Sequence, residues 1–262
     1  MNDKRSDGDR AGRGPGDWNV AWVTGASSGL GEHGARELAA RGVTVCISAR
    51  SADKLAAIAA DHPSIHAYPC DVTDADELRR VASQIEAAHG PIDLALMCAG
   101  AWFQSSITDI RLENVAKTFD INVQGVFNNL AAVLPAMVER RSGHVAWISS
   151  VAGYGGLPNS AAYGPSKAAL INLAEGVKPE LARKGITVSL INPGFVKTDM
   201  TAKNEFEMPF LMDVEPAARS MIDQLATGRF EVRFPWQLVW ILKVLNVLPY
   251  PLYFWATKKL IR

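Results

Sequence analysis

The feature that most constrains the fold of this chain is a strict alternation of short apolar runs and helical patterns. From Val20 to Gly194 six such runs occur, and a segment with helical spacing follows each of the first five. Runs that are apolar along nearly their whole length are typical of parallel strands that are covered by helices on both faces. The sequence therefore predicts an α/β fold, a doubly wound parallel sheet, within a single large domain.

The expected elements can be placed by residue range. The six strands are predicted at 20–25, 43–50, 64–72, 92–100, 143–150 and 186–194. The helices between them are predicted at 31–42, 51–62, 74–90, about 112–139 and 161–185, with Ser51 as a candidate cap. A last helix at 215–228 and a short strand at 229–235 complete the sheet. This Rossmann-like order places a ligand crevice at the carboxyl ends of the strands.

Three segments follow from composition. Residues 1–17 are rich in glycine and in charges of both signs, which predicts a disordered tail without a secretory signal and a cytoplasmic protein. Residues 18–235 form the predicted Rossmann-fold domain, and 236–262 are a hydrophobic helical extension. Basic and acidic residues number 27 each, so charge gives no sign of nucleic-acid binding. The three cysteines and five histidines lack ligand spacing, so we predict structural thiols and no metal.

The first strand runs into a glycine-rich turn, "TGASSGLG", before a helix. Glycines at this place allow backbone N–H groups to approach a pyrophosphate, with the positive end of the helix dipole behind them. We predict nucleotide contacts from six residues of the turn: Gly25, Ser27, Ser28, Gly29, Leu30 and Gly31. The spacing T-G-x-x-x-G-x-G resembles the short-chain dehydrogenase/reductase family.

The second strand ends in "SAR" and carries no acid where a ribose-binding carboxylate is expected. Ala49 holds that place and Arg50 follows it. A guanidinium suits a ribose 2′-phosphate through charge-assisted hydrogen bonds, although an arginine at a strand end can also be merely solvated. We therefore predict NADP as the cofactor in preference to NAD.

Two further strand ends match the family in part. The resemblance implies that Asp71 bonds the adenine amino group and that Val72 packs on the ring, while Asp71 could equally cap the next helix. The fourth strand ends in "MCAG" where the family usually has "NNAG". Ala99 and Gly100 are retained as cofactor contacts, and Met97 and Cys98 replace two asparagines that would brace the sheet.

The residues that would move protons lie in "YGPSK". Tyr163 and Lys167 are four apart on a helix, so the ammonium can lie near the phenol and lower its pKa, as would a positive nicotinamide ring. Ser150 ends the fifth strand thirteen positions before the tyrosine. Ser149 is the alternative, but strand alternation and the family spacing favour Ser150 as the group that holds the substrate oxygen.

Asn122, inside the long predicted helix, has two interpretations. It is a buried polar residue that kinks the helix, or the fourth catalytic residue, which holds a water that links Lys167 to solvent and contacts the cofactor. The motif "NPGFVKT" follows the sixth strand, and the resemblance implies that it fixes the nicotinamide. Its predicted contacts are Pro193, Gly194, Val196 and Thr198, and the resemblance adds Tyr163 and Lys167 to the cofactor contacts.

Together the motifs imply reversible hydride transfer between the nicotinamide and a carbonyl or secondary alcohol. We expect a hydrophobic substrate, because the variable segments supply apolar walls from Trp102, Phe103, Tyr154, Leu157, Phe206, Phe210, Leu211 and Met212. The alternatives are a 3-oxoacyl reductase of fatty-acid synthesis, an idle nucleotide-binding regulator and a membrane-recruited scaffold.

The extension reads "WQLVWILKVLNVLPYPLYFWATKK" from Trp236. Pro249 and Pro251 leave an uninterrupted helical run of only thirteen residues, whereas a membrane span needs about 20. Its apolar face is predicted to hold Leu238, Ile241, Leu242, Leu245 and Leu248. Aromatic residues and cations suit a peripheral membrane contact, and the alternative is an extension that packs on a subunit of a homo-oligomer or on the core of its own chain. Deletion of 236–262 is expected to leave the NADPH site intact.

Overall fold

A seven-stranded sheet forms the centre of the protein in a computed structural model, which describes residues 16–103, 107–203 and 207–258. All strand pairs are parallel, and the strand order is β3-β2-β1-β4-β5-β6-β7. The strands are β1 Val20–Thr24, β2 Thr44–Ser48, β3 Ile65–Ala67, β4 Leu94–Met97, β5 Gly143–Ile148, β6 Ile186–Pro193 and β7 Glu231–Phe234. The predicted doubly wound sheet in a single domain is confirmed.

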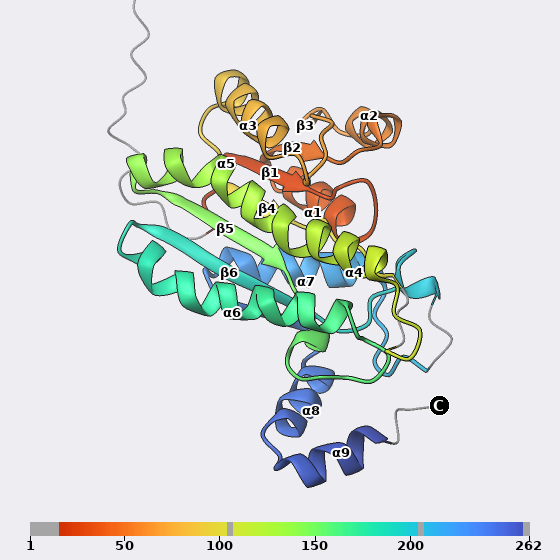
Figure 1. Cartoon of the computed structure of the whole chain (residues 1–262). Coiled ribbons are helices and arrows are strands. Elements are labelled where there is room, and N and C mark those ends of the chain that lie inside the picture. The colour runs from red at the N-terminus through yellow and green to blue at the C-terminus, as the bar shows by residue number, and fades with distance from the viewer. Residues whose placement is uncertain (1–15, 104–106, 204–206, 259–262) are drawn as a thin grey trace, which may run out of the picture.

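Helices cover both faces of this sheet (Figure 1). They are α1 Gly29–Ala40, α2 Ala52–Ala60, α3 Ala75–His89, α4 Leu112–Phe119, α5 Gly125–Arg140, α6 Tyr163–Ala182, α7 Val214–Ala226, α8 Trp236–Asn246 and α9 Tyr250–Lys258. One core cluster joins the sheet to α1, α2 and α7, and a second joins it to α3, α5 and α6. These two covers explain the continuous apolar runs of the central strands, because β1 and β4 are buried along their whole length.

The predicted order of elements is confirmed, with local differences. The third strand is only three residues long. The long helix predicted at 112–139 contains a π-helical turn, Asp120–Gln124, between α4 and α5. Ser51 stands at the N-cap position of α2, but its side chain makes no capping hydrogen bond. The third helix is capped by Asp74, whose carboxylate accepts a hydrogen bond from the N–H of Glu77 at 2.9 Å.

The strand order fixes where a ligand can bind. β1 pairs with β2 on one side and with β4 on the other, so the chain reverses its direction of winding at the carboxyl end of β1. In open parallel sheets a crevice forms at such a switch point. The glycine-rich turn follows β1 directly, so it lies at this crevice.

One helical stretch among the described residues, Leu112–Arg140, is long and apolar enough to cross a membrane by length and composition. Its second half contributes Val126, Leu130, Val133 and Met137 to the core cluster shared with the sheet. It packs as a covering helix of the α/β domain.

The C-terminal extension begins where the sequence predicts, since β7 ends at Phe234 and α8 starts at Trp236. α8 and α9 project from the body beyond the end of α6 (Figure 1). The predicted apolar face is partly wrong: Val239 is fully buried, whereas Ile241 is 54% exposed. Helix also resumes after Pro249, because Pro251 falls in the first turn of α9, where its missing N–H costs no hydrogen bond. Residues 1–15 of the predicted tail lie outside the described residues.

A buried histidine in β5 should make stability depend on pH. Burial lowers the pKa of His144 from 6.5 to about 4, and its Nε2 lies 2.9 Å from the Ser189 hydroxyl. Between these two values the unfolded chain binds a proton that the folded chain does not, so the free energy of unfolding falls as the pH falls. We expect a loss of about 3 kcal/mol between pH 6.5 and 4 from this group.

Urea unfolding of the wild type and of His144→Gln at pH 7 and pH 4.5 checks this expectation. The variant should lose less stability than the wild type on acidification. An equal loss in both proteins would contradict the assignment to His144.

Candidate active site

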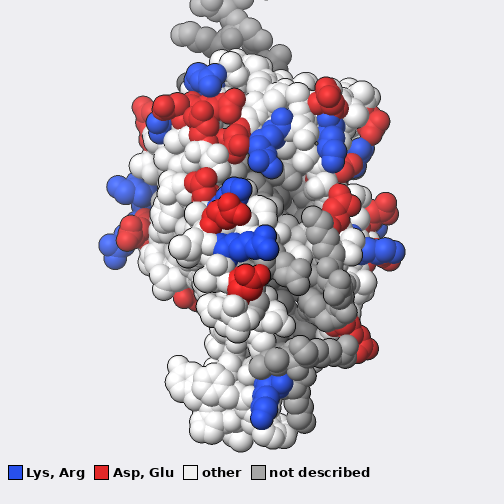
Figure 2. All heavy atoms as spheres, turned by 45° about the vertical axis from the view of Figure 1, so that its right-hand side comes forward, with Lys and Arg blue, Asp and Glu red and all other residues white. Residues whose placement is uncertain are grey.

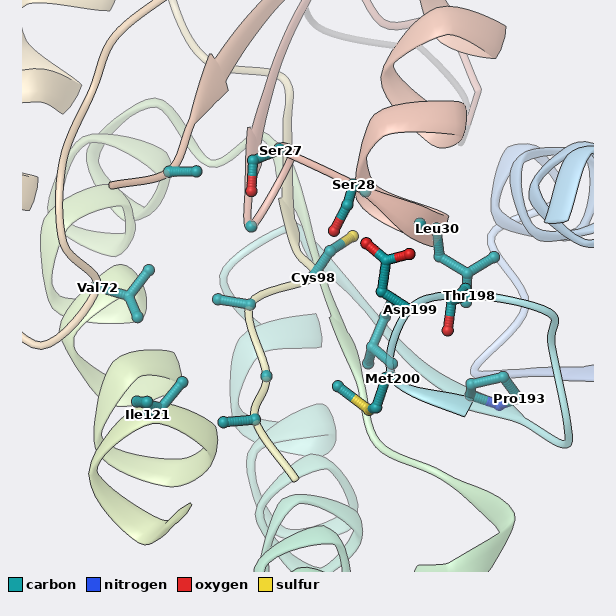
Figure 3. Close-up of a pocket in the computed structure, with 18 of the residues that line it drawn as sticks. Ser27, Ser28, Leu30, Val72, Cys98, Ile121, Pro193, Thr198, Asp199 and Met200 are labelled. Carbon is teal, nitrogen blue, oxygen red and sulfur yellow. The ribbon is translucent and has the colours of Figure 1, made fainter. Parts of the chain in front are cut away.

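A cleft opens at the carboxyl ends of the strands, at the predicted switch point. It collects nearly every site residue that the sequence predicts, from seven separate segments of the chain. Figure 3 shows side chains from the glycine turn, from the end of β4 and from the loop after β6 directed toward the same space. The predicted residues on its wall are Gly25, Ser27, Ser28, Gly29, Leu30, Gly31, Arg50, Asp71, Val72, Ala99, Gly100, Ser150, Tyr163, Lys167, Pro193, Gly194, Val196 and Thr198.

The glycine turn has the shape of a phosphate cradle. Gly25 adopts φ +75°, and a Cβ added there would lie 2.3 Å from the backbone nitrogen of Ala99. A Cβ on Gly31 would lie 2.3 Å from the carbonyl oxygen of Gly25. Ser28 occupies the N-cap position of α1 without a side-chain capping hydrogen bond. The first-turn N–H groups of α1 therefore face the cleft without a side-chain cap, and this fits the phosphates of a dinucleotide.

The end of β2 carries the residues expected at the adenosine. Ala49, Arg50 and Ser51 all line the cleft, and Arg50 is exposed. Ser51 was expected to cap α2, and its hydroxyl is instead left available to the cleft. Asp71 does not cap α3: its Oδ1 accepts hydrogen bonds from the N–H and hydroxyl of Thr73 at 3.0 and 2.9 Å. This contact holds the carboxylate on the cleft wall.

The proton-transfer residues converge at the other end of the cleft. The Lys167 ammonium lies 5.5 Å from the ring centre of Tyr163 and donates to the carbonyl oxygen of Ile148 at 2.9 Å. The Ser150 hydroxyl accepts from the N–H of Ala152 at 3.1 Å, and both Ser150 and Tyr163 line the cleft. Ser149, the alternative serine, is fully buried and donates to the carbonyl oxygen of Lys167 at 2.7 Å. Ser150 is therefore the better placed of the two.

Burial dominates the acid–base properties of this group. It lowers the pKa of Lys167 to about 8 and raises the pKa of Tyr163, while the hydrogen bond with Ser150 opposes the second shift. The expected lowering of the phenol pKa by Lys167 is wrong for the chain alone. Desolvation of the phenolate outweighs the neighbouring cation, whose proton is itself held less firmly.

Asn122 is the one predicted site residue that does not line the cleft. It is fully buried in the π-helical turn. Its Oδ1 accepts from the N–H of Ala101 at 2.7 Å, and its Nδ2 donates to the Ala101 carbonyl at 3.1 Å and to the Ser166 hydroxyl at 3.0 Å. Its side chain thus fixes the strand end after Gly100 to helix α6, one residue before Lys167. These hydrogen bonds give Asn122 a positioning role.

Met97 and Cys98, which replace the usual asparagine pair, leave the sheet end in place. Met97 packs in the core at 3% exposure, and the N–H of Cys98 donates to the Thr24 carbonyl at 2.8 Å. The Thr24 hydroxyl, however, is buried without a hydrogen-bond partner among the described residues. The backbone pairing therefore survives the change, and the polar bracing expected from asparagine does not.

The loop after β6 closes the cleft opposite the glycine turn. Thr198 lies against Gly29, because a Cβ added to that glycine would be 3.3 Å from the threonine Cγ2. Thr201 fixes the loop by donating to the Val196 carbonyl at 2.6 Å. Asp199 and Met200 were not among the predicted contacts, but both line the cleft and point into it (Figure 3). Their position beside Thr198 was the available signal.

Other wall residues follow the strand ends and were not predicted. The described part of the cleft also includes Cys70, Cys98, Ala101, Ile121, Ile148, Ser149 and Thr201. Most of them directly precede or follow a predicted contact. They would have been found if the prediction at each strand end had been extended by one residue.

The expected substrate walls are only partly available. Tyr154 donates its hydroxyl to Glu231 at 2.7 Å and packs with Val151 in a small cluster under α8, so it is not a free apolar surface. Phe210 and Leu211 are 46% and 43% exposed. Phe206 lies outside the described residues. In the described part of the chain, none of the predicted wall residues lines the cleft itself.

Comparisons with known proteins agree with this geometry. Residues 19–208 match the model of the short chain dehydrogenase family. An uncharacterized oxidoreductase of Myxococcus xanthus is 40% identical over 93% of this chain and 98% of its own length. One from Staphylococcus haemolyticus is 36% identical over 78% and 89%.

Solved structures show the same architecture. A short-chain dehydrogenase from Streptomyces avermitilis has a TM-score of 0.81 and is 27% identical, with 93% of this chain and 97% of that one covered. ElxO, solved with NADP bound, has a TM-score of 0.74 and is 26% identical, with 82% and 97% covered. With the family match spanning the glycine turn, Ser150, Tyr163 and Lys167, the chain belongs to the short-chain dehydrogenase family and is an NAD(P)-dependent oxidoreductase.

Proposed function

We propose that the protein is an NADP-dependent reductase or dehydrogenase that acts on a hydrophobic carbonyl or secondary alcohol. The observation that carries the proposal is the cleft that joins an uncapped glycine turn and Arg50 at one end to Ser150, Tyr163 and Lys167 at the other. Bound in this cleft, the nicotinamide supplies or accepts the hydride.

The residues of the chain do the rest of the work in the proposed reaction. In reduction Tyr163 gives its proton to the carbonyl oxygen, and its raised pKa keeps that proton available at neutral pH. Ser150, which lines the cleft with Tyr163, donates to the same oxygen as negative charge develops there. Lys167, whose pKa is lowered to about 8, then returns a proton to the Tyr163 phenolate.

NADP rather than NAD is supported by the end of β2. Arg50 is exposed on the cleft wall and forms no ion pair with another described residue. It is followed by Ser51, whose side chain makes no capping hydrogen bond. The neutral Ala49 between them and the strand cannot repel a 2′-phosphate. ElxO, a structural relative, was solved with NADP.

Arg50→Ala tests the cofactor. We expect the Kd for NADPH to rise about tenfold or more through the loss of charge-assisted hydrogen bonds, and the Kd for NADH to change little. Arg80→Ala, which removes an exposed arginine on α3 away from the cleft, is the matched control. A similar weakening of both cofactors, or of neither, would argue against a 2′-phosphate contact.

The substrate is tested with a panel of hydrophobic ketones, the corresponding secondary alcohols, a 3-oxoacyl thioester and small charged carbonyls. NADPH absorbance reports turnover in either direction. Turnover confined to small charged compounds would overturn the hydrophobic assignment, and turnover of the thioester alone would favour the 3-oxoacyl reductase. Cytoplasmic location and a homo-oligomer remain predictions.

A further inference from the structure

The C-terminal lobe, defined as α8, α9 and the turn between them (residues 236–258), concentrates exposed apolar side chains. It holds more than half of the large apolar side chains that are exposed among the described residues. Their exposed fractions run from 51% at Trp240 to 79% at Val247. They are Trp236, Trp240, Ile241, Val244, Val247, Tyr250, Leu252, Phe254 and Trp255. So large an apolar surface on a soluble body marks an interaction site.

One side of the lobe is firmly attached to the body. Leu238 and Val239 of α8 pack on Val151, in the loop that follows Ser150. The Tyr253 hydroxyl of α9 donates to the carbonyl oxygen of Gly156 at 2.6 Å. The exposed apolar side chains are therefore not a loosely attached tail. They are held in a fixed position beside the catalytic loop.

The shape of the surface decides between two kinds of partner. On α9 the exposed residues Tyr250, Leu252, Phe254 and Trp255 surround the buried Tyr253, so more than one face of the helix is apolar. The lobe also projects away from the sheet (Figure 1). A second copy of the chain would cover one flat side of such a projection, whereas a fluid apolar phase can cover all of its outer sides.

Charge and composition point the same way. From residue 235 to 262 the chain contains no aspartate or glutamate, and its charged residues are Lys243, Lys258, Lys259 and Arg262. Figure 2 shows the projecting lobe almost free of charge on the visible face, apart from one basic patch, while acidic and basic side chains alternate over the body above it. Tryptophan and tyrosine with nearby cations are enriched where a protein meets the headgroups of a bilayer.

We propose that the C-terminal lobe docks peripherally on an anionic lipid bilayer and holds the loop after Ser150 beside the membrane surface. α8 and α9 are 11 and 9 residues long, too short to span a hydrocarbon core about 30 Å thick, so they lie in the interface. The proposal concerns an interaction surface and does not depend on the proposed substrate, because its test requires no turnover.

The test is flotation of the full-length protein with vesicles of phosphatidylcholine and phosphatidylglycerol, and with phosphatidylcholine alone. The wild type should float with the anionic vesicles and less with the neutral ones. Val247→Glu with Leu252→Glu changes two exposed residues of the lobe and should lower the partition coefficient about a hundredfold, tenfold for each lost apolar insertion. Leu112→Glu, an equally apolar and 74% exposed position on α4, is the matched control and should float like the wild type.

Two further measurements keep the result interpretable. Thermal unfolding and NADPH binding of the double variant should match those of the wild type. Vesicles that contain brominated lipids should quench the fluorescence of the exposed tryptophans of the lobe. This measurement is made on the wild type alone. Absence of both flotation and quenching, or equal flotation of the double variant, would overturn the proposal. So would light scattering that shows a wild-type oligomer dissociating in the double variant while neither protein binds vesicles.

Discussion

Tyr163→Phe should lower carbonyl reduction by about a hundredfold to ten-thousandfold while NADPH binds with nearly unchanged affinity. The substitution removes only the phenol oxygen of a side chain that lines the cleft with Ser150. Without it the carbonyl oxygen loses its proposed proton donor, and Lys167, whose ammonium lies 5.5 Å from the ring centre, is proposed only to return a proton to that phenol. Steady-state turnover and NADPH fluorescence titration measure the two quantities separately.

Tyr68→Phe is the matched control for this variant. It also deletes one phenol oxygen, which lies 2.9 Å from Nε2 of His89 and away from the cleft. Its turnover should stay close to that of the wild type. Unchanged turnover in Tyr163→Phe would mean that another group transfers the proton, and lost NADPH binding would mean that the tyrosine serves the cofactor instead.

Gly25→Ala should both destabilise the protein and weaken NADPH binding by about a hundredfold, the effect of displacing a binding group by about 1 Å. The residue has φ +75°, and the added Cβ would lie 2.3 Å from the Ala99 nitrogen on the neighbouring strand end. Strain in the left-handed region costs about 1–2 kcal/mol, and the overlap adds about 1–3 kcal/mol more. The turn must open, which moves the N–H groups that face the phosphates.

Gly42→Ala separates these two costs. This glycine has φ +85° after α1, and nothing lies within 4 Å of an added Cβ. It should lose only the conformational part, about 1–2 kcal/mol, and keep NADPH binding. Denaturant unfolding and cofactor titration of both variants check the comparison. Equal destabilisation and equal binding in the two would show that crowding against Ala99 plays no part.

The fold and most of the cleft could be predicted because each depends on local pattern. Runs that are apolar along their whole length indicate parallel strands. Because ligands bind at the carboxyl ends of such strands, residues as distant in sequence as Gly25 and Thr198 could be assigned to one cleft. Burial of Asn122 was one of its two expected interpretations, but its hydrogen-bond partners could not be predicted in the same way. Asn122 reaches Ala101 and Ser166 because it lies in a π-helical turn, and that turn has no clear signal in the sequence.

The remaining differences also arise from tertiary contacts. Ser51 has the residue type and position of a cap, but nothing in the sequence says whether its side chain takes that bond. Val239 and Ile241 are equally apolar, and only the position of Val151 decides which of them is buried. The pKa of Tyr163 depends on how much water reaches the phenol, which spacing to Lys167 does not reveal.

The carboxylate of Glu231 links the C-terminal extension to the loops around the active site. It accepts hydrogen bonds from Tyr154 at 2.7 Å and Asn192 at 3.2 Å, and it pairs with Lys243 of α8. Leu238 also lies against Gly194, whose added Cβ would be 2.8 Å from its Cδ2. Truncation at residue 235 would therefore leave Arg233 as the remaining cation of this half-buried acid and would uncover the loop at Gly194, so cofactor binding by the truncated chain tests the expectation that this site survives deletion.

It follows that the loop after Ser150 and helix α8 depend on the same contacts. Lys243 of α8 lies over the ring of Tyr154 and pairs with Glu231. A chimera that takes the loop after Ser150 from a relative would therefore also need that relative's counterpart of α8. The loop after Ser150 can thus be transplanted only together with the segment that we propose meets the lipid.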